Sequence, residues 1–135
     1  MSQAVSVNLR RIILVVDDAE GCVATLDLVL QTLPGVEVQS APSAEAALAR
    51  LEYLEHDTVS AVITDVHLPD MTGLELISRI REDPRFHLLP ILVVSADADP
   101  LTPGRALGLG ANAYFAKPFS PSAMRKKLEE LMHAS

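Results

Sequence analysis

The sequence is poor in aromatic residues and cysteine. Its 135 residues include no tryptophan, two tyrosines, three phenylalanines and one cysteine. So few aromatic side chains argue against a stacking platform for single-stranded nucleic acid. Cys22 alone cannot form an internal disulfide, which fits a reducing compartment. The longest apolar run near the start, residues 12–16, is too short to span a bilayer, and residues 1–11 lack the apolar stretch of a signal peptide. We therefore expect a soluble, cytoplasmic chain without membrane insertion.

Basic residues are also scarce. Eleven Lys and Arg residues face 18 Asp and Glu residues, which gives a net charge of −7. This balance argues against direct binding to nucleic acid or to anionic membranes, and we interpret the basic run at 125–127 as a solvated helix face. The 49% hydrophobic content excludes a disordered chain. The length predicts one domain over 1–135, with its core at about 11–133 and no further domain.

Short β-like runs alternate with helical patterns along the whole chain. The β-like runs are residues 12–16, 36–39, 59–64, 91–94 and 113–116. The helical patterns are residues 20–33, 44–55, 73–81, 103–109 and a last segment that opens with Ser120 and Pro121. Several of the β-like runs are almost continuously apolar, as expected for strands that are buried on both faces. Five such units in series predict an α/β fold with a parallel sheet and helices on both faces.

Polar residues follow the predicted strands. Asp17 and Asp18 follow the first strand and Asp65 the third, while Ser95 and Lys117 lie at the ends of the fourth and fifth. The carboxyl ends of parallel strands meet at one edge of the sheet, where open α/β folds bind ligands. We therefore expect these five side chains to lie together.

This set of residues suits phosphoryl transfer to an aspartate. Three neighbouring carboxylates repel one another, and a hard cation such as Mg²⁺ relieves this by binding carboxylates, waters and a phosphoryl oxygen. Lys117 and Ser95 would stabilise the oxygens of the transferred group. Each residue alone also has an ordinary explanation, as a helix cap, a turn residue, a local hydrogen-bond donor or a solvated lysine. Their joint placement at one sheet edge favours the functional interpretation.

Four sequence motifs resemble the receiver domain of two-component response regulators. They are LVVDD at 14–18, DVHLPDMTG at 65–73, VSA at 94–96 and GANAYFAKPF at 110–119. Their order and spacing cover nearly the whole chain. The resemblance implies a flavodoxin-like, doubly wound five-stranded sheet in the order 2-1-3-4-5 with five helices.

The resemblance also implies a role for each matching residue. Asp65 matches the phosphorylated aspartate, which takes its phosphoryl group from a histidine kinase or a histidine phosphotransfer protein. Asp17, Asp18 and Asp65, with the main-chain carbonyl of His67, match the ligands of Mg²⁺ or Mn²⁺. Such a domain catalyses only its own phosphorylation and dephosphorylation.

Three further matches concern the switch and its output. Ser95 matches the hydroxyl residue that moves toward the phosphoryl group, Lys117 the lysine that pairs with it, and Tyr114 the aromatic residue that turns inward. The bond from Lys117 to Pro118 is often cis in this family. A downstream target protein would bind the face formed by the fourth helix, the fifth strand and the fifth helix, or the domain would pass its phosphate on in a relay.

Some features vary within the family. We expect His67 and Asp97 to border the path of the attacking water and to tune the lifetime of the acyl phosphate, with a pH dependence near neutrality. The fourth helix, rich in glycine and proline, is predicted to be loosely held. The first helix carries Leu28 and Val29 beside its core face, and one of them should present apolar surface to the phosphate donor.

Three other functions remain open from the sequence. The chain could be a fragment of a larger regulator with a DNA-binding or enzymatic output domain. It could be a phosphatase that forms an aspartyl-phosphate, although haloacid-dehalogenase-like enzymes need a second aspartate where this chain has Ala19. A degenerate receiver that only binds proteins is disfavoured by the complete residue set.

Overall fold

The structure is a computed structural model that describes residues 11–54 and 58–133. Strands and helices alternate along these residues. The strands are β1 (Arg11–Val16), β2 (Val36–Ala41), β3 (Val59–Thr64), β4 (Ile91–Ser95) and β5 (Ala113–Ala116). The helices are α1 (Glu20–Leu30), α2 (Ala44–Tyr53), α3 (Gly73–Glu82), α4 (Thr102–Leu109) and α5 (Pro121–His133), with a short 3₁₀ turn η2 (Pro84–Phe86).

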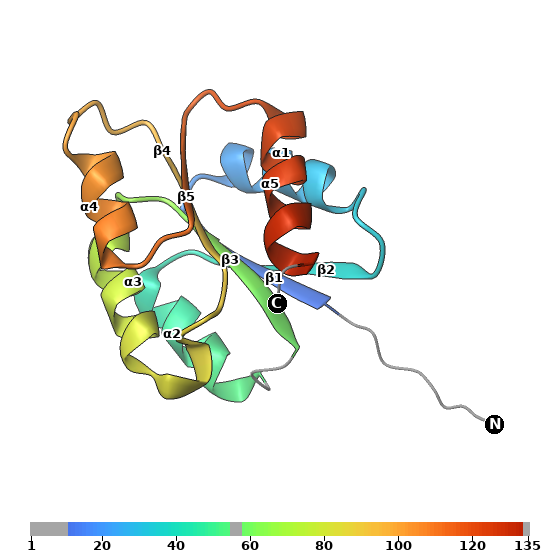
Figure 1. Cartoon of the computed structure of the whole chain (residues 1–135), viewed down its shortest axis with the longest axis horizontal. Helices are drawn as coiled ribbons and strands as arrows, with labels where there is room; N and C mark the ends of the chain where they lie inside the picture. The colour runs from blue at the N-terminus through green and yellow to red at the C-terminus, as the bar shows by residue number, and fades with distance from the viewer. Residues whose placement is uncertain (1–10, 55–57, 134–135) are drawn as a thin grey trace.

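The five strands form one parallel sheet in the order β2-β1-β3-β4-β5. Helices α1 and α5 cover one face, and α2, α3 and α4 cover the other (Figure 1). This is the doubly wound, flavodoxin-like fold expected from the sequence. None of the helices in 11–54 and 58–133 is long and apolar enough to cross a membrane.

Each face of the sheet has its own hydrophobic core. Leu14, Val62 and Val93 pack toward α2, α3 and α4, whereas Ile13, Ile63 and Leu92 pack toward α1 and α5. All but one of these six side chains are fully shielded from solvent, and Ile63 is 1% exposed. The continuous apolar runs are therefore explained by burial on both faces, because neighbouring residues of a strand point to opposite sides.

Most predicted boundaries agree with the structure within two residues, and helix α1 is the main exception. We expected it to reach Leu33, but it ends at Leu30. Pro34 disfavours helical geometry at the residue before it, and Gly35 turns the chain with φ 71°. Leu33 is nevertheless buried, as its place in the apolar pattern predicted. The end of α2 was predicted at Glu55, which lies outside the described residues.

The order in which strands are added to the sheet reverses between β1 and β3. From β1, the chain goes to β2 on one side and then to β3 on the other. The helices that follow these strands lie on opposite faces, so a crevice opens at the carboxyl ends of β1 and β3. The segments after Val16, Thr64, Ser95 and Ala116 all reach this edge. The fold thereby brings together polar residues from four distant parts of the chain.

Candidate functional site

A lysine joins two carboxylates at the carboxyl edge of the sheet. The Nζ atom of Lys117, after β5, lies 3.0 Å from Oδ2 of Asp65 and 3.3 Å from Oδ2 of Asp17. The two aspartates follow β3 and β1, so these contacts span 52 and 100 residues of sequence. The side chains of Asp17, Asp65 and Lys117 are 3%, 12% and 22% exposed. The three charges therefore form one compact, largely desolvated group.

The second oxygen of Asp65 is held by the main chain. Its Oδ1 accepts hydrogen bonds from the backbone N–H of Val66 at 2.6 Å and of His67 at 3.3 Å. With Lys117 on Oδ2, both oxygens of the carboxylate are engaged. The carboxylate is consequently fixed in one orientation at the mouth of the crevice.

Lys117 stays protonated in this setting. Burial favours the neutral amine and would lower its pKa, but the hydrogen bond and charge of Asp65, with the charge of Asp17, outweigh burial and raise the pKa above its ordinary value. The ammonium group thus compensates the two carboxylates at any physiological pH.

The acidic residues suit a hard cation. Asp17 uses Oδ1 to accept the backbone N–H of Ala19, and the neighbouring Asp18 is exposed. Among the residues that the structure describes, no three Asp, Glu, His or Cys side chains are grouped tightly enough to hold an ion alone. Mg²⁺ needs only one or two protein carboxylates, because waters, a carbonyl and phosphate oxygens complete its shell. The oxygen donors at this edge fit that requirement.

Ser95, Asp97 and His67 form a second, connected group beside Asp65. Ser95 is fully buried, and its Oγ accepts the backbone N–H of Asp97 at 3.1 Å. The Asp97 carboxylate accepts a hydrogen bond from Thr102 at 3.1 Å, and its Oδ2 lies 3.3 Å from Nε2 of His67. The backbone N–H of Asp99, followed by the hydroxyl of Thr102 and the neighbouring His67, lowers the pKa of Asp97. The pair His67–Asp97 therefore joins the β3–α3 loop to the β4–α4 loop.

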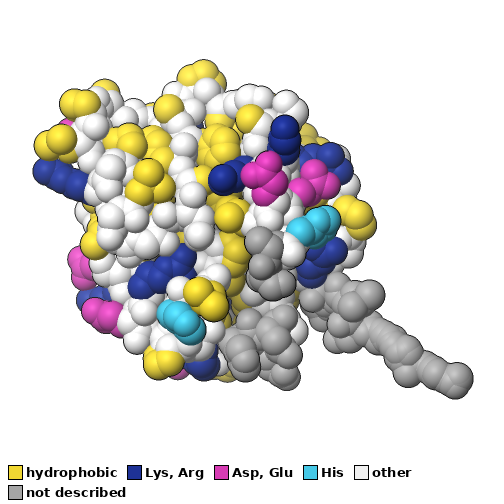
Figure 2. All heavy atoms as spheres, in the orientation of Figure 1, with side chains coloured by type: hydrophobic (Ala, Val, Ile, Leu, Met, Phe, Trp, Pro, Cys, Tyr) yellow, Lys and Arg dark blue, Asp and Glu magenta, His cyan; other side chains and the backbone are white. Residues whose placement is uncertain are grey.

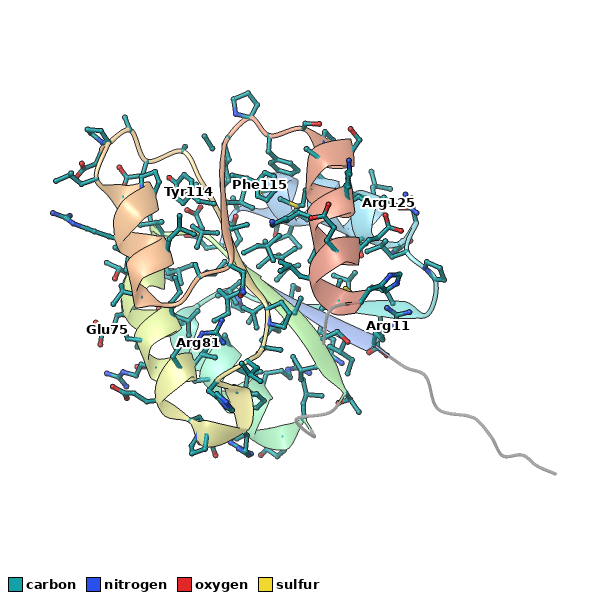
Figure 3. The ribbon with its side chains drawn as sticks, in the orientation of Figure 1. Arg11, Glu75, Arg81, Tyr114, Phe115 and Arg125 are labelled. Atoms are coloured by element: carbon teal, nitrogen blue, oxygen red, sulfur yellow. The ribbon has the colours of Figure 1, made fainter. Side chains whose placement is uncertain are left out.

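Tyr114 lies on β5 toward α4, whereas Phe115 lies toward α5 (Figure 3). The Tyr114 ring packs on the core between the sheet and helices α2–α4, and its hydroxyl is buried without a hydrogen-bond partner among the described residues. The nearby bond from Lys117 to Pro118 is cis, as the resemblance implied. Tyr114 is thus turned inward in this structure.

Helix α4 is held at both ends. At its start, Oδ1 of Asp99 accepts the backbone N–H of Leu101 at 2.9 Å, and the hydroxyl of Thr102 donates to Asp97 at 3.1 Å. Within the helix, a Cβ added at Gly104 or Gly108 would meet open space. At its end, Arg81 donates to the carbonyl of Gly110 from two nitrogens, at 3.1 and 2.7 Å. The predicted mobility of α4 stays a prediction.

The sequence reasoning missed two residues near the site. Cys22 lies close to Asp17 and Lys117, and it interacts with the charges of both. Burial, followed by the hydrogen bond and the charge of Asp17, raises the pKa of its thiol. Asp70 reaches from the β3–α3 loop to the start of α2. The only sequence signal for Cys22 was its position four residues after Asp18, and nothing in the sequence pointed to the partner of Asp70.

Known proteins resemble this chain over almost its whole length. The model of the response regulator receiver domain matches residues 13–129. Chemotaxis protein CheY1 of Helicobacter pylori is 31% identical over 121 residues, which cover 89% of this chain and 95% of the relative. Chemotaxis protein CheY-3 of Vibrio cholerae is 30% identical over 124 residues, with 92% and 93% covered.

Solved structures give the same result. A putative response regulator from Chloroflexus aurantiacus superposes with a TM-score of 0.82 at 34% identity, covering 92% of this chain and 98% of the other. The chemotaxis response regulator CheY4 of Vibrio cholerae has a TM-score of 0.79 at 28% identity, with 90% and 98% covered. The sheet order, the polar cluster at its carboxyl edge and these similarities lead to one conclusion: the chain belongs to the response regulator receiver domain family.

Proposed function

We propose that this domain is a phosphorylation-activated signalling switch. Asp65 would accept a phosphoryl group from a phosphohistidine of a histidine kinase or a histidine phosphotransfer protein. The main support is the carboxylate of Asp65, whose two oxygens are oriented by Lys117 and by two backbone N–H groups. A carboxylate held in this way is suited to in-line attack.

In the proposed reaction, one oxygen of Asp65 forms a bond to phosphorus while the bond from phosphorus to the donor imidazole breaks. The electron pair of that bond leaves with the imidazole nitrogen, and Asp65 becomes an acyl phosphate. Lys117 would then donate a hydrogen bond to a phosphoryl oxygen instead of to Asp65. Ser95 is suited to donate to another, because its oxygen accepts the N–H of Asp97 and its hydroxyl donates to none of the described residues.

Receiver domains generally bind Mg²⁺ at their acidic pocket. In this chain the proposed ligands of Mg²⁺, or of Mn²⁺ in its place, are the carboxylates of Asp17, Asp18 and Asp65 and the main-chain carbonyl of His67. The bound cation would offset the negative charge that the phosphate oxygens bring to the site. The residues of the chain would orient the reacting groups around it.

Phosphorylation would shift the population of two conformers. Contacts from Ser95 and Lys117 to the phosphoryl group exist only in the modified state, so they favour the active conformer, which would keep the inward orientation that Tyr114 has in this structure. The proposed output is a target protein bound at α4, β5 and α5. Hydrophobic side chains gather over α4 (Figure 2), where Leu101 and Leu107 are 59% and 48% exposed.

His67 and Asp97 are proposed to tune the lifetime of the acyl phosphate. Their side chains bridge the two loops beside Asp65 at 3.3 Å, where a hydrolytic water would approach. We expect His67→Ala to change the dephosphorylation rate without changing which residue is phosphorylated. Equal decay of phosphate from wild type, His67→Ala and Asp97→Asn would exclude this role.

The decisive experiment is incubation with acetyl phosphate and Mg²⁺, followed by intact-mass measurement. We expect wild type to gain one phosphoryl group that hydroxylamine removes, and Asp65→Asn to gain none. Asp83→Asn is the matched control, because Asp83 pairs with Arg85 outside the crevice; it should be phosphorylated normally. An adduct on both wild type and Asp65→Asn, or on neither, would refute the assignment.

A second experiment addresses the output. Beryllofluoride mimics the phosphoryl group, so a pull-down that uses this domain as bait can be made with and without it. The target protein should be captured only when beryllofluoride is present. Leu107→Ser should weaken this capture while leaving phosphorylation intact. Capture that is the same in both states would contradict a phosphorylation-dependent output.

A further inference from the structure

An aspartate of the β3–α3 loop caps a helix elsewhere in the chain. Asp70 accepts hydrogen bonds from the backbone N–H of Ala44 through Oδ1, at 3.0 Å, and of Glu45 through Oδ2, at 2.7 Å. These are the first two residues of α2, about 25 positions away. Asp70 is not the ordinary cap of this helix, because Ser43 takes that place and accepts the N–H of Ala46.

Ser43 and Asp70 together accept hydrogen bonds from the backbone N–H groups at the start of α2. Ser43 satisfies Ala46 through its hydroxyl and Ala47 through its carbonyl, and Asp70 satisfies the two remaining N–H groups of the first turn. The N–H of Glu45, first among several backbone donors, lowers the pKa of Asp70. The group is therefore a carboxylate at neutral pH, and its bonds to the start of α2 are charge-assisted.

The loop that carries Asp70 is held by a backbone hydrogen bond at its base and by side chains at its tip. At its base, the N–H of Gly73 donates to the carbonyl of Val66 at 2.7 Å and closes a bridge between His67 and Thr72. At its tip, residues 68–71, the only hydrogen bonds to another element among the described residues are those of Asp70. Leu68 and Met71 add apolar packing on the core.

This arrangement bears on the carbonyl of His67. The bond that closes the bridge uses the carbonyl of Val66, not that of His67. His67 belongs to the base, but its carbonyl is part of the peptide that joins it to Leu68 of the tip, so the direction of this carbonyl depends on where the tip is held. Oxygen ligands of Mg²⁺ must sit close to octahedral positions. If residues 68–71 were mobile, the carbonyl oxygen of His67 would point toward the cation for only part of the time.

We infer that Asp70 is a positioning residue for the metal site, because by tying the loop tip to α2 it aims the His67 carbonyl at the cation. The inference rests on the proposed function only in taking that carbonyl as a ligand. If Asp70 instead did no more than stabilise α2, its loss would affect stability and leave metal affinity unchanged. The two roles therefore differ in a measurable way.

The chain offers a matched control for this test. Asp70→Ala and Ser43→Ala each remove a side-chain cap from α2, but only Asp70→Ala releases the loop. Mg²⁺ affinity is measured directly, from NMR chemical shifts during titration with MgCl₂ and without phosphate. Re-ordering one backbone residue on binding changes an equilibrium constant by roughly 5- to 30-fold, so we expect Asp70→Ala to bind Mg²⁺ about tenfold more weakly and Ser43→Ala to stay within twofold of wild type.

Phosphorylation kinetics supply a second readout. With acetyl phosphate, the half-saturating Mg²⁺ concentration of Asp70→Ala should rise about tenfold, while its rate at saturating Mg²⁺ stays within twofold of wild type. Asp70→Asn keeps the Oδ1 acceptor for Ala44 and should lie between wild type and Asp70→Ala. This variant also preserves the size of the side chain, so it tests the inference even if Asp70→Ala fails to fold.

Two results would overturn the inference. One is unchanged Mg²⁺ affinity in Asp70→Ala and Asp70→Asn; the other is equal weakening by Ser43→Ala, which would make the effect a consequence of a frayed α2. Failure of the proposed function is a separate outcome. It would show as Mg²⁺ binding by wild type without phosphorylation of Asp65, and the affinity comparison among the variants would still decide the role of Asp70.

Discussion

Lys117→Met tests whether one lysine compensates the two carboxylates of the site. Methionine keeps the length of the apolar stem and removes the charge. Nζ of Lys117 lies 3.0 Å from Asp65 and 3.3 Å from Asp17. At an effective dielectric constant of about 20, each contact has a Coulomb energy of roughly 5 kcal/mol. The cost of removing the charges from water offsets much of this gain.

The net change in the free energy of unfolding depends on the two carboxylates that Lys117→Met leaves without a compensating charge. Removing one partner of a buried ion pair typically costs about 3–5 kcal/mol, because a charge is left uncompensated. Lys117 is 22% exposed, and water can reach the two carboxylates after its loss. We therefore expect Lys117→Met to lower the free energy of unfolding by about 3 kcal/mol in EDTA.

Urea denaturation with and without Mg²⁺ measures this prediction. A cation bound beside Asp17 and Asp65 replaces the missing charge, so Mg²⁺ should recover most of the loss and stabilise the variant more than wild type. Arg79→Met is the control: Arg79 forms an exposed pair with Glu75, whose loss should cost at most about 0.5 kcal/mol. A loss below about 1 kcal/mol in Lys117→Met, or equal stabilisation of both proteins by Mg²⁺, would refute the reasoning.

Three further predictions concern glycines and an aspartate. A Cβ at Gly73 would collide with the backbone carbonyl of Asp65, so Gly73→Ala should lower the free energy of unfolding by about 3 kcal/mol, whereas Gly21→Ala, with open space around it, should raise it by about 0.5–1 kcal/mol. Gly108→Ala in α4 should likewise stabilise by about 1 kcal/mol, and urea denaturation that showed a loss would contradict the open space there. The lowered pKa of Asp70 means that its contribution to stability is complete above its ordinary pKa of 3.8 and disappears as the pH falls through the lower, folded value. Asp70→Asn should therefore lose less stability than wild type as the pH falls from about 5 to below 3.8. Equal losses in the two proteins would contradict this prediction.

The element pattern could be predicted from the sequence because it depends on local spacing. The continuous apolar run before Asp17 predicted a strand buried on both faces, and all of its residues from Ile12 to Val16 are buried. The end of α1 was predicted three residues too late. The apolar spacing continues to Leu33, but Pro34 and Gly35 end the helix before it. Leu33 is buried and so continues the apolar pattern of α1, although the helical hydrogen bonds end before it.

The members of the candidate site could also be predicted, because parallel strands bring their carboxyl ends to one edge. That argument placed Asp17, Asp65 and Lys117 together, and the structure shows them in contact. It could not predict which groups would bond, nor that His67 and Asp97 would form a pair across two loops. Those contacts depend on loop conformation, for which sequence spacing gives no signal. Their roles in phosphorylation stay predictions.

The sequence by itself determined the alternation of strands and helices, the burial of the apolar runs of β1, β3 and β4, and the edge at which the polar residues meet. These follow from periodicity and from the direction of parallel strands, which are local properties repeated five times. Only the tertiary structure decided that Lys117 bridges two aspartates and that Asp70 caps α2. The reason is physical: hydrogen bonds between residues far apart in the chain require positions accurate to a fraction of an ångström, and these arise only when all the layers have packed.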